Sequence, residues 1–231
     1  MTRAPADEPL LTFTAHRLER ADLHALMARS DGPALWRTAW HFGALAVTGT
    51  LVWRFRATSW LPPFIVAHGY ALAFLFCAFH EMAHRTAFRT RWLNALVGTV
   101  AGLLIVWPYR NYRVFHWEHH RHTQDVARDP ELFFAKPASV GAYLFALTGI
   151  PYLENTRTTL TIALVRLFAW NMPYHAEHHA YPAVPFHALP RLHERVRAEI
   201  ANLEPGYVAA TAKVNRYLWS GQAAGTTGAT N

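Results

Sequence analysis

The chain has 231 residues, 52% of them hydrophobic, yet its mean hydropathy is only +0.02, so the apolar residues must be concentrated in segments. Its net charge is +7, and no nucleic-acid-binding motif accompanies it, so we interpret the basic surplus as a membrane-facing feature and expect no nucleic-acid partner. The single cysteine, Cys77, excludes an internal disulfide and is expected to be an inert thiol.

Two apolar segments come first along the chain, at residues 38–53 and 61–79. Each approaches the roughly 20 residues that a helix needs to cross the bilayer core. Tryptophans stand near their ends, where an interfacial aromatic belt is expected. The sequence therefore predicts two long antiparallel transmembrane helices near residues 38–56 and 61–85. A buried helical hairpin in a soluble protein is the alternative.

The distribution of arginine predicts the orientation of this hairpin. Arginines precede the first segment and follow the second, whereas only Arg54 and Arg56 lie in the connecting turn. Because basic residues favour the cytoplasmic side, we expect both termini and the histidine clusters described below to be cytoplasmic.

The rest of the chain contains shorter apolar segments. Residues 93–108 are too few to span comfortably and are interpreted as re-entrant or interfacial. Residues 139–152 and 158–171 are likewise apolar and short, and residues 189–203 follow an amphipathic helical pattern. We predict an all-α integral membrane protein, without β-sheet, in which a cytoplasmic helical cap covers the two long helices. We expect residues 1–221 to form one domain and residues 222–231 to be a disordered tail.

Eight of the fifteen histidines form three clusters with helical spacing. Residues at i, i+3 and i+4 project from one helix face, so each cluster can aim its imidazoles at a common point. Eight nitrogens exceed the ligands of one tetrahedral zinc and suit two transition-metal ions, although spacing does not select iron. The predicted ligands are His80, His84, His116, His119, His120, His175, His178 and His179.

The motifs HEMAH, FHWEHHRHTQDVARDPEL and NMPYHAEHHAYPAVPFHALPRLH, in this order, resemble the three histidine boxes of the integral-membrane fatty acid desaturase superfamily. The resemblance runs from about residue 20 to residue 195. It implies two iron ions, activation of O2 at the cytoplasmic membrane face, and removal of hydrogen from a lipid acyl chain. It also implies an electron donor such as ferredoxin or cytochrome b5. Related proteins act as hydroxylases or ketolases, including on carotenoids.

Other polar residues near the boxes are candidates for supporting roles. Carboxylates inside or just after the boxes can accept imidazole N–H groups and thereby orient the ligands. Asn171 either caps the helix of the third box or faces the metals, as an Asn does in some desaturases. His41 is expected to be packed or hydrogen-bonded, and His122 to project away from the ligand face. His187 and His193 are assigned to the amphipathic C-terminal helix. The five acidic candidates are Glu81, Glu118, Asp125, Asp129 and Glu177.

The connection between the second and third boxes is short, with 54 residues between His120 and His175. The family pattern has a longer connection with a transmembrane hairpin and often a further metal-binding histidine. We therefore expect weak or absent desaturation even with iron bound, because the substrate channel would lack a wall.

Two other functions remain open. A degenerate, non-catalytic metal-binding membrane protein would retain the boxes without the activity. HEMAH also fits HExxH of zinc proteases, with Glu81 as general base, but that function leaves six box histidines unexplained.

Overall fold

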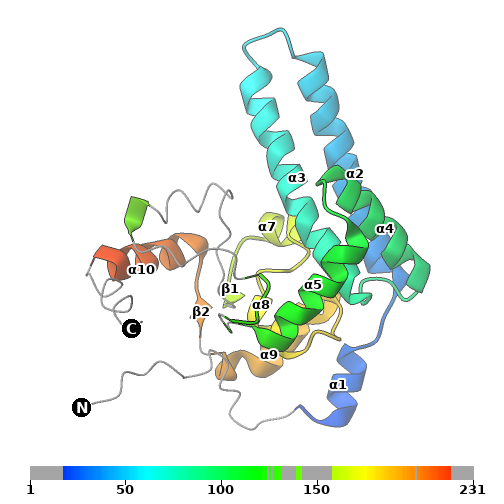
Figure 1. Ribbon diagram of the computed structural model, residues 1–231, viewed down its shortest axis with the longest axis vertical. Coiled ribbons are helices and arrows are strands. Elements are labelled where there is room, and N and C mark those ends of the chain that lie inside the picture. Colours follow the sequence, from blue (N-terminus) through cyan, green and yellow to red (C-terminus); the bar gives the residue numbers. More distant parts are fainter. Residues whose placement is uncertain are drawn as a thin grey trace.

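The computed structural model describes residues 18–123, 125, 127–131, 139–141, 158–200 and 202–219. These residues are mostly helical. After the short α1 (Arg20–Leu26), the 24-residue helices α2 (Asp31–Arg54) and α3 (Leu61–His84) form an antiparallel hairpin that projects from the remaining helices (Figure 1).

The hairpin matches the two predicted long helices, but its two helices differ in apolar character. Among the described helices, α3 is the one that by itself is long and apolar enough to cross a membrane. Helix α2 begins at Asp31, seven positions before the expected start, and so also includes the charged residues Asp31 and Arg37. A span through α3 fits the prediction, whereas a second span through α2 stays a prediction.

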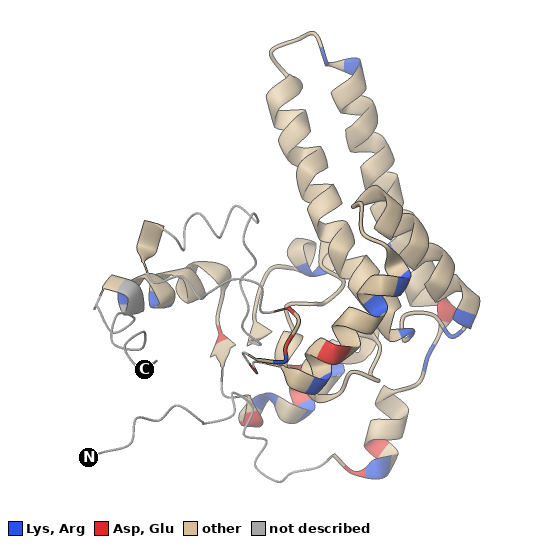
Figure 2. Ribbon diagram, viewed as in Figure 1, with Lys and Arg blue, Asp and Glu red and all other residues tan. Residues whose placement is uncertain are grey.

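Charge is unevenly distributed over the hairpin. In Figure 2 basic residues mark the turn at its tip, where Arg54 and Arg56 lie, and most other charged residues gather around the opposite end. Large apolar side chains between these ends point outward, with Val47 61% and Tyr70 64% exposed. Such an apolar outer surface is typical of a membrane-contacting one.

His41 lies buried inside the hairpin and is hydrogen-bonded through both ring nitrogens. Trp170 Nε1 donates to His41 Nδ1 (3.2 Å), so His41 Nε2 carries the proton and donates to the Ala71 carbonyl oxygen (2.9 Å). The expectation of a packed histidine is confirmed. The same contacts attach the segment before the third box to both long helices.

Helices α4 (Arg91–Leu104) and α5 (Tyr109–His122) are bent by 101° relative to each other. Two glycines permit this return of the chain, because a Cβ at Gly98 would lie 2.4 Å from the Tyr109 ring and one at Gly102 would lie 2.4 Å from the Trp107 carbonyl oxygen. Tyr109 Oη in turn donates to the Met82 carbonyl oxygen (2.6 Å). The sharp bend agrees with the re-entrant or interfacial interpretation of residues 93–108.

The C-terminal part consists mainly of short elements, of which α8 and α9 lie beneath the hairpin and α10 lies to one side (Figure 1). They are β1 (Thr158–Thr159), α7 (Ala163–Phe168), α8 (His175–Ala180), η1 (Phe186–Ala188), α9 (Leu189–Val196), η2 (Arg197–Glu199), β2 (Leu203–Glu204) and α10 (Tyr207–Trp219).

Strands β1 and β2 pair in parallel, so the prediction of no β-sheet was wrong for this two-residue pair. The prediction relied on the cost of lipid-exposed strand edges, but Thr158 and Thr159 are buried in protein. Residues 158–171, read from the sequence as one apolar segment, instead divide into β1, α7 and a turn.

The predicted amphipathic helix at 189–203 is found in shortened form. Helix α9 buries Leu189, Leu192 and Val196 against the protein core, and a 3-10 turn follows it. The amphipathic face therefore packs on protein. Residues 142–152 of the earlier apolar segment and the tail at 222–231 lie outside the described residues, so the single-domain assignment stays a prediction.

Candidate metal centre

The structure brings all eight box histidines together from three helices. His80 and His84 end α3, His116, His119 and His120 lie on the inner face of α5, and the third box is α8 itself. Five of them offer ring nitrogens that all lie within 4.8 Å of one another: His80, His84, His116, His120 and His178.

His84 is the point where the boxes meet. Its Nε2 lies 2.9 Å from His116 Nε2 and 3.0 Å from His178 Nε2, so one atom from each box faces the same small volume. A left-handed residue, Arg85 (φ 57°), ends α3 immediately after it.

The other three histidines extend this cluster. His179 Nε2 lies 3.1 Å from His175 Nε2, and the ring centroid of His179 lies 4.3 Å from that of His120 and 5.0 Å from that of His119. The eight rings are therefore contiguous. Their role as metal ligands stays a prediction.

Two carboxylates fix the protonation of the second box. His116 Nδ1 donates to Glu131 (2.7 Å), and His119 Nδ1 donates to Asp129 (2.8 Å). Since the proton sits on Nδ1 in each ring, Nε2 presents a lone pair. Lone pairs about 3 Å apart repel each other unless a cation lies between them, so this donor set fits metal binding.

Burial keeps the imidazoles neutral. Loss of hydration, assisted by neighbouring imidazoles, lowers the pKa of His120 to about 3 and that of His175 to about 4. The same causes hold the pKa values of His116, His178 and His179 well below their usual range. Neutral imidazole is the form that binds a metal, so these rings are ready for one at neutral pH without releasing a proton.

The five acidic candidates have different fates. Asp129 orients a box histidine as predicted, and Glu81 lies beside the cluster, with Oε1 3.7 Å from His178 Nδ1. Glu118 and Asp125 instead pair with surface arginines, and Glu177 faces away from the cluster. The prediction was wrong for Glu118 and Glu177 because a residue two positions after the first box histidine lies on the opposite helix face. It was wrong for Asp125 because its carboxylate is bonded to Arg128 and to the Ala127 amide.

Two supporting residues were missed by sequence reasoning. Glu131 follows Asp129 by two positions in the DPEL motif, and this closeness to a predicted acceptor could have identified it as a second one. His193 was assigned to the C-terminal helix, where it does lie, but its Nδ1 donates to Glu177 in the interior. Only the packing of α9 against α8 reveals that contact.

Asn171 does not cap α8, so that alternative was wrong: the residue before α8 is Tyr174. Asn171 adopts a left-handed conformation (φ 60°), and its Nδ2 donates to the Phe186 carbonyl oxygen (3.0 Å). This bond shapes the turn before the third box. A metal-facing role for Asn171 stays a prediction.

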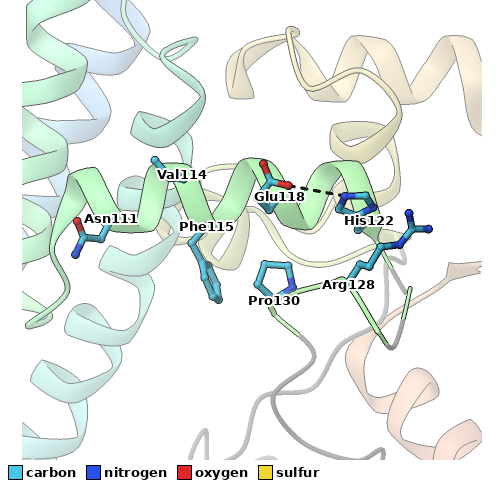
Figure 3. A pocket seen from close by; sticks show the side chains of 7 residues that line it. All are labelled: Asn111, Val114, Phe115, Glu118, His122, Arg128 and Pro130. Carbon is cyan, nitrogen blue, oxygen red and sulfur yellow. Dashed lines mark ion pairs between the residues drawn. The ribbon is translucent and has the colours of Figure 1, made fainter.

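An open groove of about 710 Å³ lies along α5, and no box histidine lines it; Figure 3 shows the residues that do. His122 is there, 3.8 Å from Glu118, as expected from its position off the ligand face. The groove is lined by Asn111, Val114, Phe115, Glu118, His122, Arg128 and Pro130.

The sequence model of the fatty acid desaturase family matches residues 57–155 and 146–211, more than half of the chain. The chain belongs to this family. The two matches meet between the second and third boxes, in the region where the connection is short.

Among curated proteins, the chain is 26% identical over 219 residues to an sn-1 oleoyl-lipid 12-desaturase of Anabaena variabilis, covering 68% of this chain and 63% of that protein. An sn-1 oleoyl-lipid 12-desaturase of Synechocystis is 36% identical over 128 residues, which cover 44% of this chain and 36% of that protein. A zeaxanthin 4-ketolase of Chlamydomonas reinhardtii is 29% identical over 225 residues, which cover 80% of this chain and 50% of that protein. The chain thus spans less than two thirds of each of these proteins. No solved structure matches it.

Proposed function

We propose that this chain is a membrane-bound, O2-dependent oxidoreductase that holds two iron ions and acts on lipid acyl chains. The observation that carries the proposal is the convergence of eight histidines from the three boxes, with His84 in contact with the other two boxes. Family membership and the apolar helix α3 agree with it.

The side chains have distinct tasks in this proposal. The eight box histidines would hold the iron ions, and Asp129 and Glu131 would orient His119 and His116 so that their Nε2 atoms face inward. Burial of the cluster limits the access of water. Iron with O2 supplies, when bound, the oxidising power needed to break an unactivated C–H bond, which no side chain provides.

The substrate and partners follow from the relatives. The oleoyl-lipid desaturases favour an acyl chain carried on a membrane lipid, and α3 would place the cluster near such a lipid. We further propose that the boxes and both termini face the cytoplasm, where ferredoxin, cytochrome b5 or an equivalent donor supplies electrons.

A second candidate is oxidation of a carotenoid. The zeaxanthin ketolase matches a larger share of this chain, 80%, than the Anabaena desaturase does. The histidine cluster suits both reactions because the boxes hold the metals and the substrate channel selects the C–H bond.

The test is expression of the full chain with a matched electron donor in a host that makes unsaturated lipids and carotenoids. Iron content, fatty acids and carotenoids are measured together, with His84→Ala as the inactive control. We expect two irons per chain and an oxidised lipid product that the control lacks. One zinc per chain would favour the protease alternative, and absence of bound metal would contradict the proposal.

The same experiment addresses the short link between the second and third boxes. We expect little desaturated product even in the iron-loaded protein. Abundant formation of a double bond at one position would refute the idea that the missing hairpin limits activity.

A further inference from the structure

The second and third boxes share the pattern H-x-E-H-H, but their glutamates occupy different environments. Glu118 on α5 is 40% exposed and pairs with Arg121. Glu177 on α8 has no exposed side-chain surface, and its carboxylate accepts one bond from Thr158 Oγ1 and another from His193 Nδ1. A carboxylate buried in this way requires a structural or functional reason.

The two partners of Glu177 are themselves held firmly. The amide of Thr158 donates to the Asn202 carbonyl oxygen (3.1 Å), and that of Thr159 donates to the Pro173 carbonyl oxygen (3.0 Å) just before α8. His193 lies on α9, whose apolar face is buried in the core. The Glu177 carboxylate therefore joins α8 to β1 on one side and to α9 on the other.

Helix α8 needs such an attachment. It has six residues, too few to be stable alone, and no side-chain cap hydrogen bond at its start. It nevertheless has to aim three imidazoles, and His178, the neighbour of Glu177, lies with Nε2 3.0 Å from His84 Nε2. A small rotation of α8 would move His178 out of the cluster.

We propose that Glu177 is a positioning residue that sets the direction of the third-box imidazoles by holding α8 between Thr158 and His193. The inference rests on the proposed metal centre for its consequence, although the attachment itself exists without a metal. Glu118, at the same position of the second box, has no such role because α5 is long and packed along its length.

The test uses the full chain purified in detergent without metal and then titrated with Co²⁺, whose absorption spectrum reports ligand geometry. Glu177→Ala removes both bonds and is expected to weaken Co²⁺ binding by about tenfold or more, the range typical of residues that orient ligands. It should also change the spectrum at saturating Co²⁺. Glu177→Gln can still accept from His193 and donate to Thr158 Oγ1, so it should restore most of the affinity and the wild-type spectrum. Glu118→Ala is the matched control and should behave as wild type.

A second readout needs no metal. Diethylpyrocarbonate modification of His178, followed by mass spectrometry, should be about tenfold faster in Glu177→Ala if α8 opens that much more often, with His116 unchanged. If the alanine variant does not fold, Thr158→Val removes one bond at nearly constant volume and should show the same changes at smaller size.

The outcomes separate the two proposals. Wild-type protein that binds no Co²⁺ would contradict the metal centre, while the modification of His178 still decides the role of Glu177. Equal affinity, spectrum and His178 modification in wild type and in Glu177→Ala, or in wild type and Thr158→Val where the alanine variant does not fold, would overturn the positioning role.

Discussion

The second and third histidine boxes have the same spacing but are supported in different ways. The second box lies on the 14-residue helix α5, and acceptors on the following loop, Asp129 and Glu131, bond directly to its imidazoles. The third box lies on the six-residue helix α8, and Glu177 fixes the helix to its neighbours without touching a box imidazole.

This difference follows from helix length. Helix α5 has about four turns, and its packing against α3 and α4 fixes its position. The carboxylates near it can therefore serve to orient single imidazole rings. A helix of less than two turns has no such stability, and its own glutamate is used to hold it. An identical motif thus predicts where the imidazoles point but not what keeps them there.

The largest effect on metal content is expected from a change at His84, where the three boxes meet. Replacing His84 with alanine removes the nitrogen that lies about 3 Å from both His116 and His178, so His80 alone is left to represent the first box in the cluster. We expect loss of at least one metal ion per chain, measured by elemental analysis of the purified protein. His122→Ala, on the outer face of α5, should keep full metal content. Equal metal content in both variants would contradict the shared centre.

Removing the direct support of the second box should have the next largest effect. Asp129→Asn keeps the shape of the side chain but removes the negative charge that accepts from His119 Nδ1, and should weaken metal binding about tenfold. Asp125→Asn, at a carboxylate paired with Arg128 on the surface, is the control. A metal titration of both variants checks this, and a loss of affinity shared by the two would count against a specific role for Asp129.

Removing the hydrogen bond that attaches the third box to the hairpin should lower the free energy of unfolding. Trp170→Phe leaves His41 Nδ1 buried without its donor, at a cost of about 1–3 kcal/mol in the free energy of unfolding. The control is Trp36→Phe, since Trp36 is 57% exposed. Thermal unfolding in detergent measures both, and an equal shift in the two proteins would show that the His41 contact contributes nothing of its own.

The smallest effect is expected at the surface of the second box. Glu118→Gln removes an exposed pair with Arg121, so stability should change by no more than about 0.5 kcal/mol. Unfolding of this variant beside wild type is the measurement. If the free energy of unfolding falls by about 2 kcal/mol or more, Glu118 also stabilises the fold, and the contrast with Glu177 disappears.

Several residues illustrate the limit of sequence reasoning. Asp129 was predicted as an orienting acceptor because it follows the second box closely, and this was confirmed. Glu118 was predicted in the same way and lies instead on the surface, because closeness in sequence does not fix the helix face. Asn171 was expected as a possible cap, but the turn before α8 is formed by left-handed residues that the sequence pattern does not reveal.

The sequence alone determined the three helical histidine boxes, the long apolar segment that became α3, and the family, because helical periodicity, hydropathy and motif order are local properties of the chain. Tertiary structure decided which carboxylates reach the imidazoles, that Thr158 and His193 hold the third box through Glu177, and that His41 and Trp170 tie that box to the hairpin. Those contacts join residues up to 129 positions apart, and no local preference specifies them. They form only where packing brings buried polar groups together, each of which must then find a partner.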